Sequence, residues 1–307
     1  VKRGQDYDKD FVSISKYLMR CPNPPKAVLL ENGLSDCCSS APPMMELLHH
    51  PEFGLHHNLR YRFDVVKVDA KEFGLPQPRP RIYFVGVRLD LDPNGKVLAD
   101  IKSRIDLLRD LVPPKPWYDM LAAQDESLAK PSEKRRKVAT SRTFACIAGD
   151  FRQEHGLSPR KRPVAKKASA EFIRLFTARQ LEVLDCSVLL NAKSDRPLKN
   201  LIVNPSAAVV RKPWRSDGMV PTITTNTRLV SPYREQELSL CSLFQFQGWR
   251  EHDLPHVLSV LAEKPSQLRT LIGNMFAVPV VGAIFHAVVA SLRFRADTDF
   301  SPQAGSG

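Results

Sequence analysis

The sequence has little cysteine, little glycine and a shortage of acidic residues, and each shortage excludes a class of protein. Its 307 residues contain 6 Cys and no CxxC pair, which argues against a disulfide framework or a zinc ribbon and favours free thiols in a reducing compartment. The 14 Gly are outnumbered by 25 Pro, so we expect many breaks and extended connections. Lys and Arg exceed Asp and Glu by 45 to 33, and the resulting charge of +12 favours a polyanionic partner, either nucleic acid or an anionic membrane surface.

No signal peptide is visible, but one long apolar run raises the question of a membrane. Residues 275–292 could pass a crude test for a spanning helix, although they contain Pro279 and His286. We interpret this run as a buried core helix and predict no membrane contact. The first residue is Val rather than Met, from which we predict a fragment or a processed product.

Residues 1–90 have the pattern of an α/β domain. Apolar residues at helical spacing alternate along the chain with short runs rich in β-branched and aromatic residues. The run at 27–30 predicts a fully buried strand that stops at Glu31-Asn32. The expected elements are helices at 10–20 and 44–50, strands at 27–30, 61–68 and 81–89, and a turn at 92–95.

Residues 91–220 differ in character, because charge is clustered and apolar periodicity is patchy. Residues 130–170 hold 12 Lys/Arg against 3 Asp/Glu, mostly in two basic runs at 134–137 and 160–167. Such runs indicate a phosphate-contacting segment or a nuclear localisation signal, and a solvated flexible insert explains them equally well. Helical spacing, with a small slip, predicts a helix over 171–191.

Residues 221–292 return to an ordered pattern, and residues 293–307 have the composition of a disordered polar tail. We expect an extended segment at 222–227, a mixed helical segment at 236–246 and an apolar helix at 279–292. Ile272-Gly273-Asn274 precedes this last helix.

Four stretches then occur in a particular order. They are PPKAVLLENG (24–33), VVKVDAKEFGLPQPRPRIYFVGV (65–87), the region from Pro221 to Trp249, and LIGNMFAVPVVGAIFHAV (271–288). This order resembles the C-terminal two-thirds of the cytosine-C5 DNA methyltransferases. PKAVLLEN is similar to the family's Glu-Asn-Val motif, GLPQPRPR to its Gln-x-Arg-x-Arg motif, and IGNMFAVPV to its closing Gly-Asn motif.

The resemblance implies a fold and a domain order. The expected class is α/β, an incomplete Rossmann-like S-adenosylmethionine-dependent methyltransferase sheet with an inserted small target-recognition region. Residues 1–90 would be the C-terminal part of the catalytic domain, 91–220 the basic recognition region, and 221–292 the return to the catalytic domain. A sheet without its first strands would expose an edge and an apolar face, so we predict that the isolated chain aggregates.

Glu31 is the first predicted catalytic residue. In an open α/β sheet, ligands bind beyond the carboxyl ends of the strands, where we place Glu31. The resemblance implies that Glu31 grips the Watson–Crick edge of a flipped cytosine. Because a dry pocket disfavours charge, we expect a raised pKa, and a proton-sharing carboxyl could bond N3 and the exocyclic amine and so make C6 attackable.

The other predicted site residues follow from the remaining motifs. Gln77, Arg79 and Arg81 alternate with prolines, so in an extended chain they would share one face. By resemblance, Arg79 and Arg81 hold the base carbonyl and a phosphate, and an exposed basic edge strand is the simpler alternative. The resemblance also implies catalytic Asn32, S-adenosylmethionine contacts from Gly273 and Asn274, and DNA contacts from Gln77 and Thr224. The two basic runs predict DNA contacts from Arg135, Arg136, Arg160 and Arg162.

Two parts of the family's chemistry have no counterpart in the sequence. No Gly-rich cofactor loop precedes Glu31, and no Pro-Cys dipeptide supplies a thiolate nucleophile. Gly33 replaces the usual Val, and the family's Arg-Glu pair falls on Cys241-Ser242 or on Arg234-Glu235. We therefore expect either part of an active DNA methyltransferase, completed in cis or by a second chain, or an inactive nucleic-acid-binding remnant. The long insert argues against the tRNA-methylating branch.

Two smaller expectations complete the sequence-based predictions. The basic runs predict a nuclear protein if the source is eukaryotic, and otherwise an intracellular one. His49-His50 and His56-His57 lie near Cys37-Cys38, but they meet no standard zinc spacing, so we predict no metal site.

Overall fold

The computed structural model describes residues 12–18, 20–33, 48–49, 61–121, 142–254 and 265–296. The chain divides into two compact units, neither of which is a continuous piece of sequence. Unit 1 comprises Val1–Phe73, Pro80–Leu111 and Pro279–Gly307, and unit 2 comprises Gly74–Arg79 and Val112–Val278. Residues 221–278 therefore belong to the compact unit 2. The functional boundaries at 90, 220 and 292 that were drawn from the sequence stay predictions.

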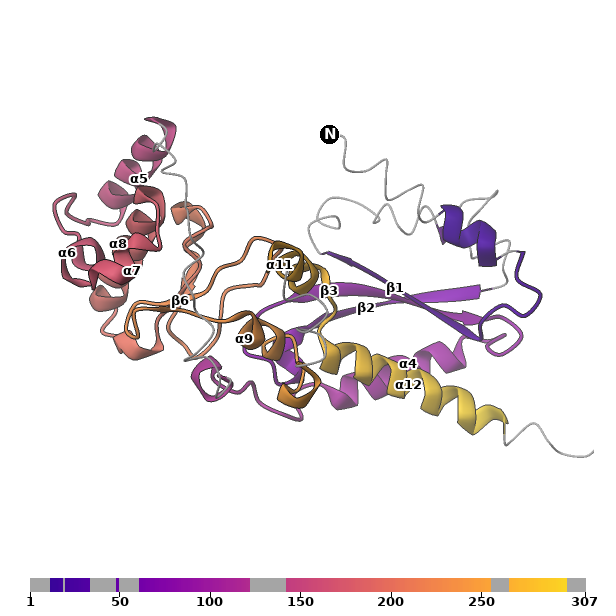
Figure 1. Cartoon of the computed structure of the whole chain (residues 1–307). Coiled ribbons are helices and arrows are strands. Elements are labelled where there is room, and N and C mark those ends of the chain that lie inside the picture. The colour runs from indigo at the N-terminus through magenta and orange to yellow at the C-terminus, as the bar shows by residue number, and fades with distance from the viewer. Residues whose placement is uncertain are drawn as a thin grey trace, which may run out of the picture. The chain divides into compact units, whose positions relative to one another are not determined.

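Unit 1 is built on a three-stranded sheet in the order β1-β3-β2 (Figure 1). β1 (Ala27–Gly33) and β2 (Tyr61–Asp69) both run antiparallel to the central β3 (Pro80–Arg88). The interior of β3 is buried on both faces, which explains its continuous apolar sequence. The predicted strands at 61–68 and 81–89 are confirmed.

The predicted turn after β3 is confirmed and starts helix α4 (Lys96–Leu108). The Asp92 carboxylate accepts hydrogen bonds from the backbone N–H groups of Val97 at 2.9 Å and Leu98 at 3.1 Å. These bonds satisfy donors that the first helical turn leaves without partners. The buried face of α4 packs against β2 and β3, and its residues are Val97, Leu98, Ile101 and Ile105.

Helix α12 (Val278–Ala296) is half buried, so the prediction of a buried core helix is wrong. Its buried side chains follow one face at helical spacing, and they include Val280 and Ile284. Phe285 and Val289 on another face are 56% and 45% exposed. In the described part of the chain, no single helix is long and apolar enough to span a membrane, although Ser266–Asn274 and Val278–Leu292 pass such a test together as a broken pair.

Unit 2 contains a second sheet, whose four strands of two residues each are too short to be stable alone. The order is β5-β4-β6-β7, with all neighbours antiparallel. The strands are β4 (Ile202–Val203), β5 (Trp214–Arg215), β6 (Val230–Ser231) and β7 (Gln236–Glu237).

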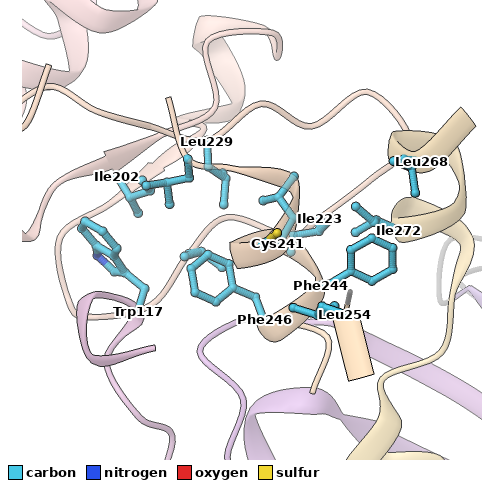
Figure 2. Packing of buried hydrophobic residues seen from close by; sticks show 13 residues of the cluster. Trp117, Ile202, Ile223, Leu229, Cys241, Phe244, Phe246, Leu254, Leu268 and Ile272 are labelled. Atoms are coloured by element: carbon cyan, nitrogen blue, oxygen red, sulfur yellow. The ribbon is translucent and has the colours of Figure 1, made fainter. Parts of the chain in front are cut away.

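Two hydrophobic clusters hold unit 2 together. The first joins Trp117 and Phe246 to Phe244, which lies beside Ile272 and Leu254 (Figure 2). This cluster packs helices α9 (Leu240–Gln245) and α11 (Pro265–Asn274) against the short strands. The second cluster packs a group of four helices, which are α5 (Arg142–Glu154), α6 (Pro163–Lys167), α7 (Ala170–Arg174) and α8 (Ala178–Lys193).

The four-helix part corrects two expectations. Residues 142–193 form packed helices, so for this stretch the alternative of a flexible insert is wrong. The single helix predicted over 171–191 is two helices, α7 and α8. The slip in the pattern marks Thr177, which caps α8 in a reciprocal capping box with Gln180.

Two further expectations change near the end of unit 2. The segment at 236–246, expected to be mixed helical, begins with β7 and becomes helical only in α9, where Ser239 accepts the capping hydrogen bond. Gly273-Asn274 forms the last turn of α11 and does not open the following helix.

Candidate functional site

Glu31 and Arg81 form an ion pair in unit 1. The register aligns Glu31 with Tyr83 and Gly33 with Arg81, so the two charged residues are diagonal neighbours on one face of the antiparallel pair. Arg81 Nε lies 2.7 Å from Glu31 Oε1. The two side chains keep 22% and 21% of their surface exposed, so the pair is anchored and still open to a ligand.

The structure corrects the local setting of Glu31. β1 continues through Glu31 to Gly33, so the carboxyl lies within a strand and not beyond its tip. The strand is partly exposed along its length, and the prediction of a fully buried strand is wrong because β1 lies at one end of the three-strand order. Successive residues point to opposite faces, which places Asn32 on the other side of the sheet from Glu31.

Gln77 and Arg79 lie in unit 2, inside the protein. Arg79 is 3% exposed, and its guanidinium donates to the backbone carbonyls of Ile223 at 2.7 Å, Gly273 at 3.0 Å and Met275 at 2.9 Å. Gln77 is 0% exposed, and its amide donates to the carbonyl of Phe246 at 2.7 Å. We call these two side chains the bracket, because they join segments that are far apart in sequence.

The expectation that Gln77, Arg79 and Arg81 share one surface is wrong. Strand β3 begins at Pro80, so only Arg81 belongs to the extended, alternating segment. In this structure the bracket residues bond to protein groups and have almost no surface for DNA. Their predicted roles in catalysis and DNA binding stay predictions.

Gly273 has a packing role at the end of α11. A Cβ built there would lie 2.1 Å from the backbone nitrogen of Thr225, so only glycine fits. Asn274 is exposed at the last helical position, and Thr224 is an exposed residue whose backbone N–H donates to the Thr227 hydroxyl at 2.7 Å. The structure thus brings Gly273 next to Thr224-Thr225. The cofactor and DNA contacts predicted for these residues stay predictions.

The basic residues predicted to bind DNA have different settings. Arg160 is exposed. Arg162 forms an ion pair with Glu182, which also binds the buried Arg152, so part of the Arg162 charge is neutralised inside unit 2. Arg135 and Arg136, with the basic run at 134–137 that supported nuclear localisation, lie outside the described residues.

Comparison with known proteins decides the family. The sequence model of the C-5 cytosine-specific DNA methylase family matches residues 11–290. The chain belongs to this family. A curated relative, Type II methyltransferase M.MthTI of Methanothermobacter thermautotrophicus, is 28% identical over 100 residues, which is 30% of this chain and 30% of that relative. The family predicted from the ordered motifs is confirmed, and with it the S-adenosylmethionine-dependent methyltransferase fold at the family level.

One buried residue that the sequence analysis did not select, Gln247, bonds to two distant segments of unit 2. It is 0% exposed, its Nε2 donates to the Ile272 carbonyl at 3.1 Å, and its Oε1 accepts from Gln77 at 3.0 Å. Gln247 therefore links the Gln-x-Arg-x-Arg segment to the end of α11. The signal in the sequence was a Gln-Gly dipeptide, Gln247-Gly248, inside the region from Pro221 to Trp249 that resembles the family.

A partly buried charge cluster was also missed. Glu237 binds Arg228 through both carboxylate oxygens and Arg269 at 3.1 Å, while Arg228 lies over the ring of Phe176. These residues are separated in sequence, and no local pattern joins them.

The described residues add limited evidence on metals and thiols. No group of three potential metal ligands occurs among them, although Cys37-Cys38 and His56-His57 lie outside the description. Cys21, Cys146, Cys186 and Cys241 are not joined in disulfides, and burial raises the pKa of Cys186.

Proposed function

We propose that this chain carries the base-activating carboxyl of a DNA cytosine-C5 methyltransferase whose methyl donor is S-adenosyl-L-methionine. The observation that supports the proposal is the pair of Glu31 and Arg81 at 2.7 Å. Two residues from separate motifs, 50 positions apart in the numbering, meet on one face of the sheet with exposed surface left on each.

Glu31 would bind and polarise the target base. A cytosine flipped from the duplex offers N3 and the exocyclic amine on one edge, and a carboxyl that shares a proton can bond both. Arg81 would hold the carboxyl in place and donate to the base carbonyl. Both contacts withdraw electrons from the ring, so C6 becomes more open to attack by a thiolate. The Pro-Cys motif for that thiolate is not in the sequence, so the step needs a nucleophile from another segment or chain.

Gly273 and Asn274 do not on their own form a binding site for S-adenosyl-L-methionine. The space at the Cα of Gly273 is filled by the Thr224-Thr225 backbone, and Asn274 is exposed. The donor would supply the methyl group, and we assign no step of its transfer to these two residues.

We further propose that the three strands are part of a larger Rossmann-like sheet and that residues 91–220 contain the target-recognition region. The support for the sheet is that β1 and β2, each antiparallel to β3, run parallel to each other. The support for the recognition region is the basic composition of the four-helix part of unit 2. Light scattering of the 307-residue chain tests the sheet, because exposed sheet surface favours aggregation. A monodisperse chain would contradict this proposal.

The central test is Glu31→Gln in a preparation that transfers methyl groups. We expect transfer to fall at least ~100-fold, because a general acid–base group contributes about that much or more, with duplex DNA affinity nearly unchanged. Glu72→Gln is the matched control, because Glu72 pairs with Arg109 in the same unit at similar exposure, 26% and 27%, and is expected to keep full activity. Lost DNA affinity with surviving transfer would refute the role of Glu31.

The second candidate is a nucleic-acid-binding protein without transferase activity. The observation in its favour is the basic composition, +12 overall, with no Pro-Cys in the sequence. It predicts salt-sensitive DNA binding with no transfer of labelled methyl groups, even when the rest of a methyltransferase is supplied. Label transfer that depends on Glu31 would exclude it.

A further inference from the structure

Unit 2 contains a polar cavity, and none of its lining residues belongs to the sequence motifs. Its volume is about 380 Å³, and it lies between the end of α8 and residues 212–217. The side chains that decide its chemistry are Asn191, Arg196, Lys212, Trp214, Arg215 and Asp217.

The charge in this cavity is positive. Arg215 and Asp217 form a bidentate pair and cancel each other, and the Arg215 guanidinium lowers the pKa of Asp217, which keeps that carboxyl ionised. Arg196 and Lys212 add two positive charges with no ion-pair partner within the described part of the chain. Arg196 Nη1 reaches only the Ser216 hydroxyl, at 3.3 Å. The cavity is therefore suited to an anion.

Asn191 adds a second, independent observation. It is 5% exposed, and its Nδ2 donates to the Arg196 carbonyl at 2.8 Å, but its Oδ1 is buried without a hydrogen-bond partner. A buried acceptor left unsatisfied costs free energy, and in native proteins such a group calls for a bound water, an ion or a local rearrangement. The unpaired positive charge beside it would be satisfied by a ligand with an anionic group.

We propose that this cavity binds a nucleotide through its phosphate. Arg196 and Lys212 hold the phosphate, because charge-assisted hydrogen bonds to phosphate are the strongest that such a pocket can make. The partly exposed Trp214 at the wall offers an apolar surface to the base. The volume of about 380 Å³ lies in the range of small-molecule sites and is too small for a duplex, which can insert one phosphate at most. A free nucleotide and a phosphate of a DNA strand share this chemistry.

Calorimetric titration of the full chain with deoxynucleoside 5′-monophosphates and with inorganic phosphate tests the proposal. Lys212→Gln and Arg196→Gln are each expected to weaken monophosphate binding about 10-fold or more, since each removes a charge-assisted bond. Both side chains are exposed, so the fold is expected to persist. Lys199→Gln is the matched control, an exposed lysine that is not among the cavity residues, and is expected to bind like the unaltered chain.

A duplex without terminal phosphates separates the two sources. If the two variants lose affinity for monophosphates and for this duplex, the cavity holds a phosphate of the DNA strand. If they lose only monophosphates, the ligand is a free nucleotide. If the unaltered chain binds no monophosphate, or if Lys199→Gln weakens binding as much as Lys212→Gln, the proposal is wrong. None of these readouts requires methyl transfer, so they are independent of the role of Glu31.

Discussion

Arg79 and Arg81 belong to one motif and are separated by a single proline, yet they differ in burial and in the groups that they bind. In unit 2, Arg79 is 3% exposed and its guanidinium donates hydrogen bonds to three backbone carbonyls. In unit 1, Arg81 is 22% exposed and faces one carboxylate. The difference teaches that a motif can combine a residue that maintains a fold with a residue that is available to a ligand. Substitutions in the bracket are expected to lower the stability of unit 2, and substitutions in the Glu31–Arg81 pair to lower methyl transfer.

The largest effect on stability is expected from Arg79→Ala. The substitution leaves three carbonyls without their donor, and we expect unit 2 to lose about 4 kcal/mol of unfolding free energy. All three tryptophans, Trp117, Trp214 and Trp249, lie in unit 2, so their fluorescence during denaturation reports on this unit. Arg81→Ala is the matched control and is expected to leave the tryptophan transition in place. If both substitutions lowered the unfolding free energy of unit 2 equally, Arg79 and Arg81 would not differ in their contribution to its stability.

Gly273→Ala is expected to have the next largest effect. Its new Cβ would meet the Thr225 backbone nitrogen at 2.1 Å, so the end of α11 or the Thr224-Thr225 segment must shift. Overpacking of this kind costs about 1–3 kcal/mol, seen in the same tryptophan transition. Gly282→Ala serves as the control, because a Cβ there meets nothing within 4 Å. An unchanged transition in Gly273→Ala would show that the segment yields without cost.

Asp185 tests how burial alone changes an acid in unit 2. Burial raises its pKa above the ordinary 3.8, although the Val164 and Ala165 N–H groups oppose this by donating to the carboxylate. The folded state then holds the proton more tightly than the unfolded state, so the stability from this group is full below 3.8 and falls as pH rises through the raised pKa. Asp185→Asn is expected to remove this loss of stability with rising pH. At pH 7 the unfolding free energy should change by less than about 1 kcal/mol, because the amide oxygen still accepts the two hydrogen bonds.

The control for Asp185 is Asp217→Asn. The hydrogen bond from Arg215 lowers the Asp217 pKa, so the stability from Asp217 is present above the ordinary 3.8 and is lost as pH falls through the lowered pKa. The difference curves of the two variants against pH, measured by denaturation, should therefore slope in opposite directions. Parallel curves would contradict the assigned causes.

The smallest effect on stability is expected at the Glu31–Arg81 pair. Partly exposed ion pairs contribute about 0–1 kcal/mol and are screened by salt. Hydrogen exchange of peptides covering β1 and β3 should show a coupling within this range for a double-mutant cycle of Glu31→Gln and Arg81→Ala. The coupling should shrink in high salt. A coupling of several kcal/mol would make the pair a structural element like the bracket.

The sequence predicted the elements with strong local patterns. β2 and β3 are dense in β-branched and aromatic residues, which predicted both strands. The resemblance assigned Glu31 and Arg81 to the same flipped base, but it did not predict their ion pair, which the register of β1 and β3 brings about. The fate of Gln77 and Arg79 was not predictable, because alternation applies only within a strand and β3 starts at Pro80.

Long-range contacts account for the other misses. The bonds of Gln247 and the Glu237 cluster depend on partners tens of residues away, which no periodicity records. The break before α8 was visible as a slip, but its cause, the Thr177-Gln180 capping box, is a local signal that we did not use. Exposure of one face of α12 was missed because its sequence is apolar on nearly every side.

The bracket has a consequence for how such proteins diversify. Gln77 and Arg79 sit on a six-residue loop, Gly74–Arg79, that is far in sequence from the rest of unit 2, and their acceptors include the main-chain carbonyls of Ile223, Phe246, Gly273 and Met275. Main-chain acceptors do not depend on side-chain identity. Side-chain substitutions elsewhere in unit 2 would therefore leave these hydrogen bonds in place, provided that the backbone keeps its path at the four carbonyls.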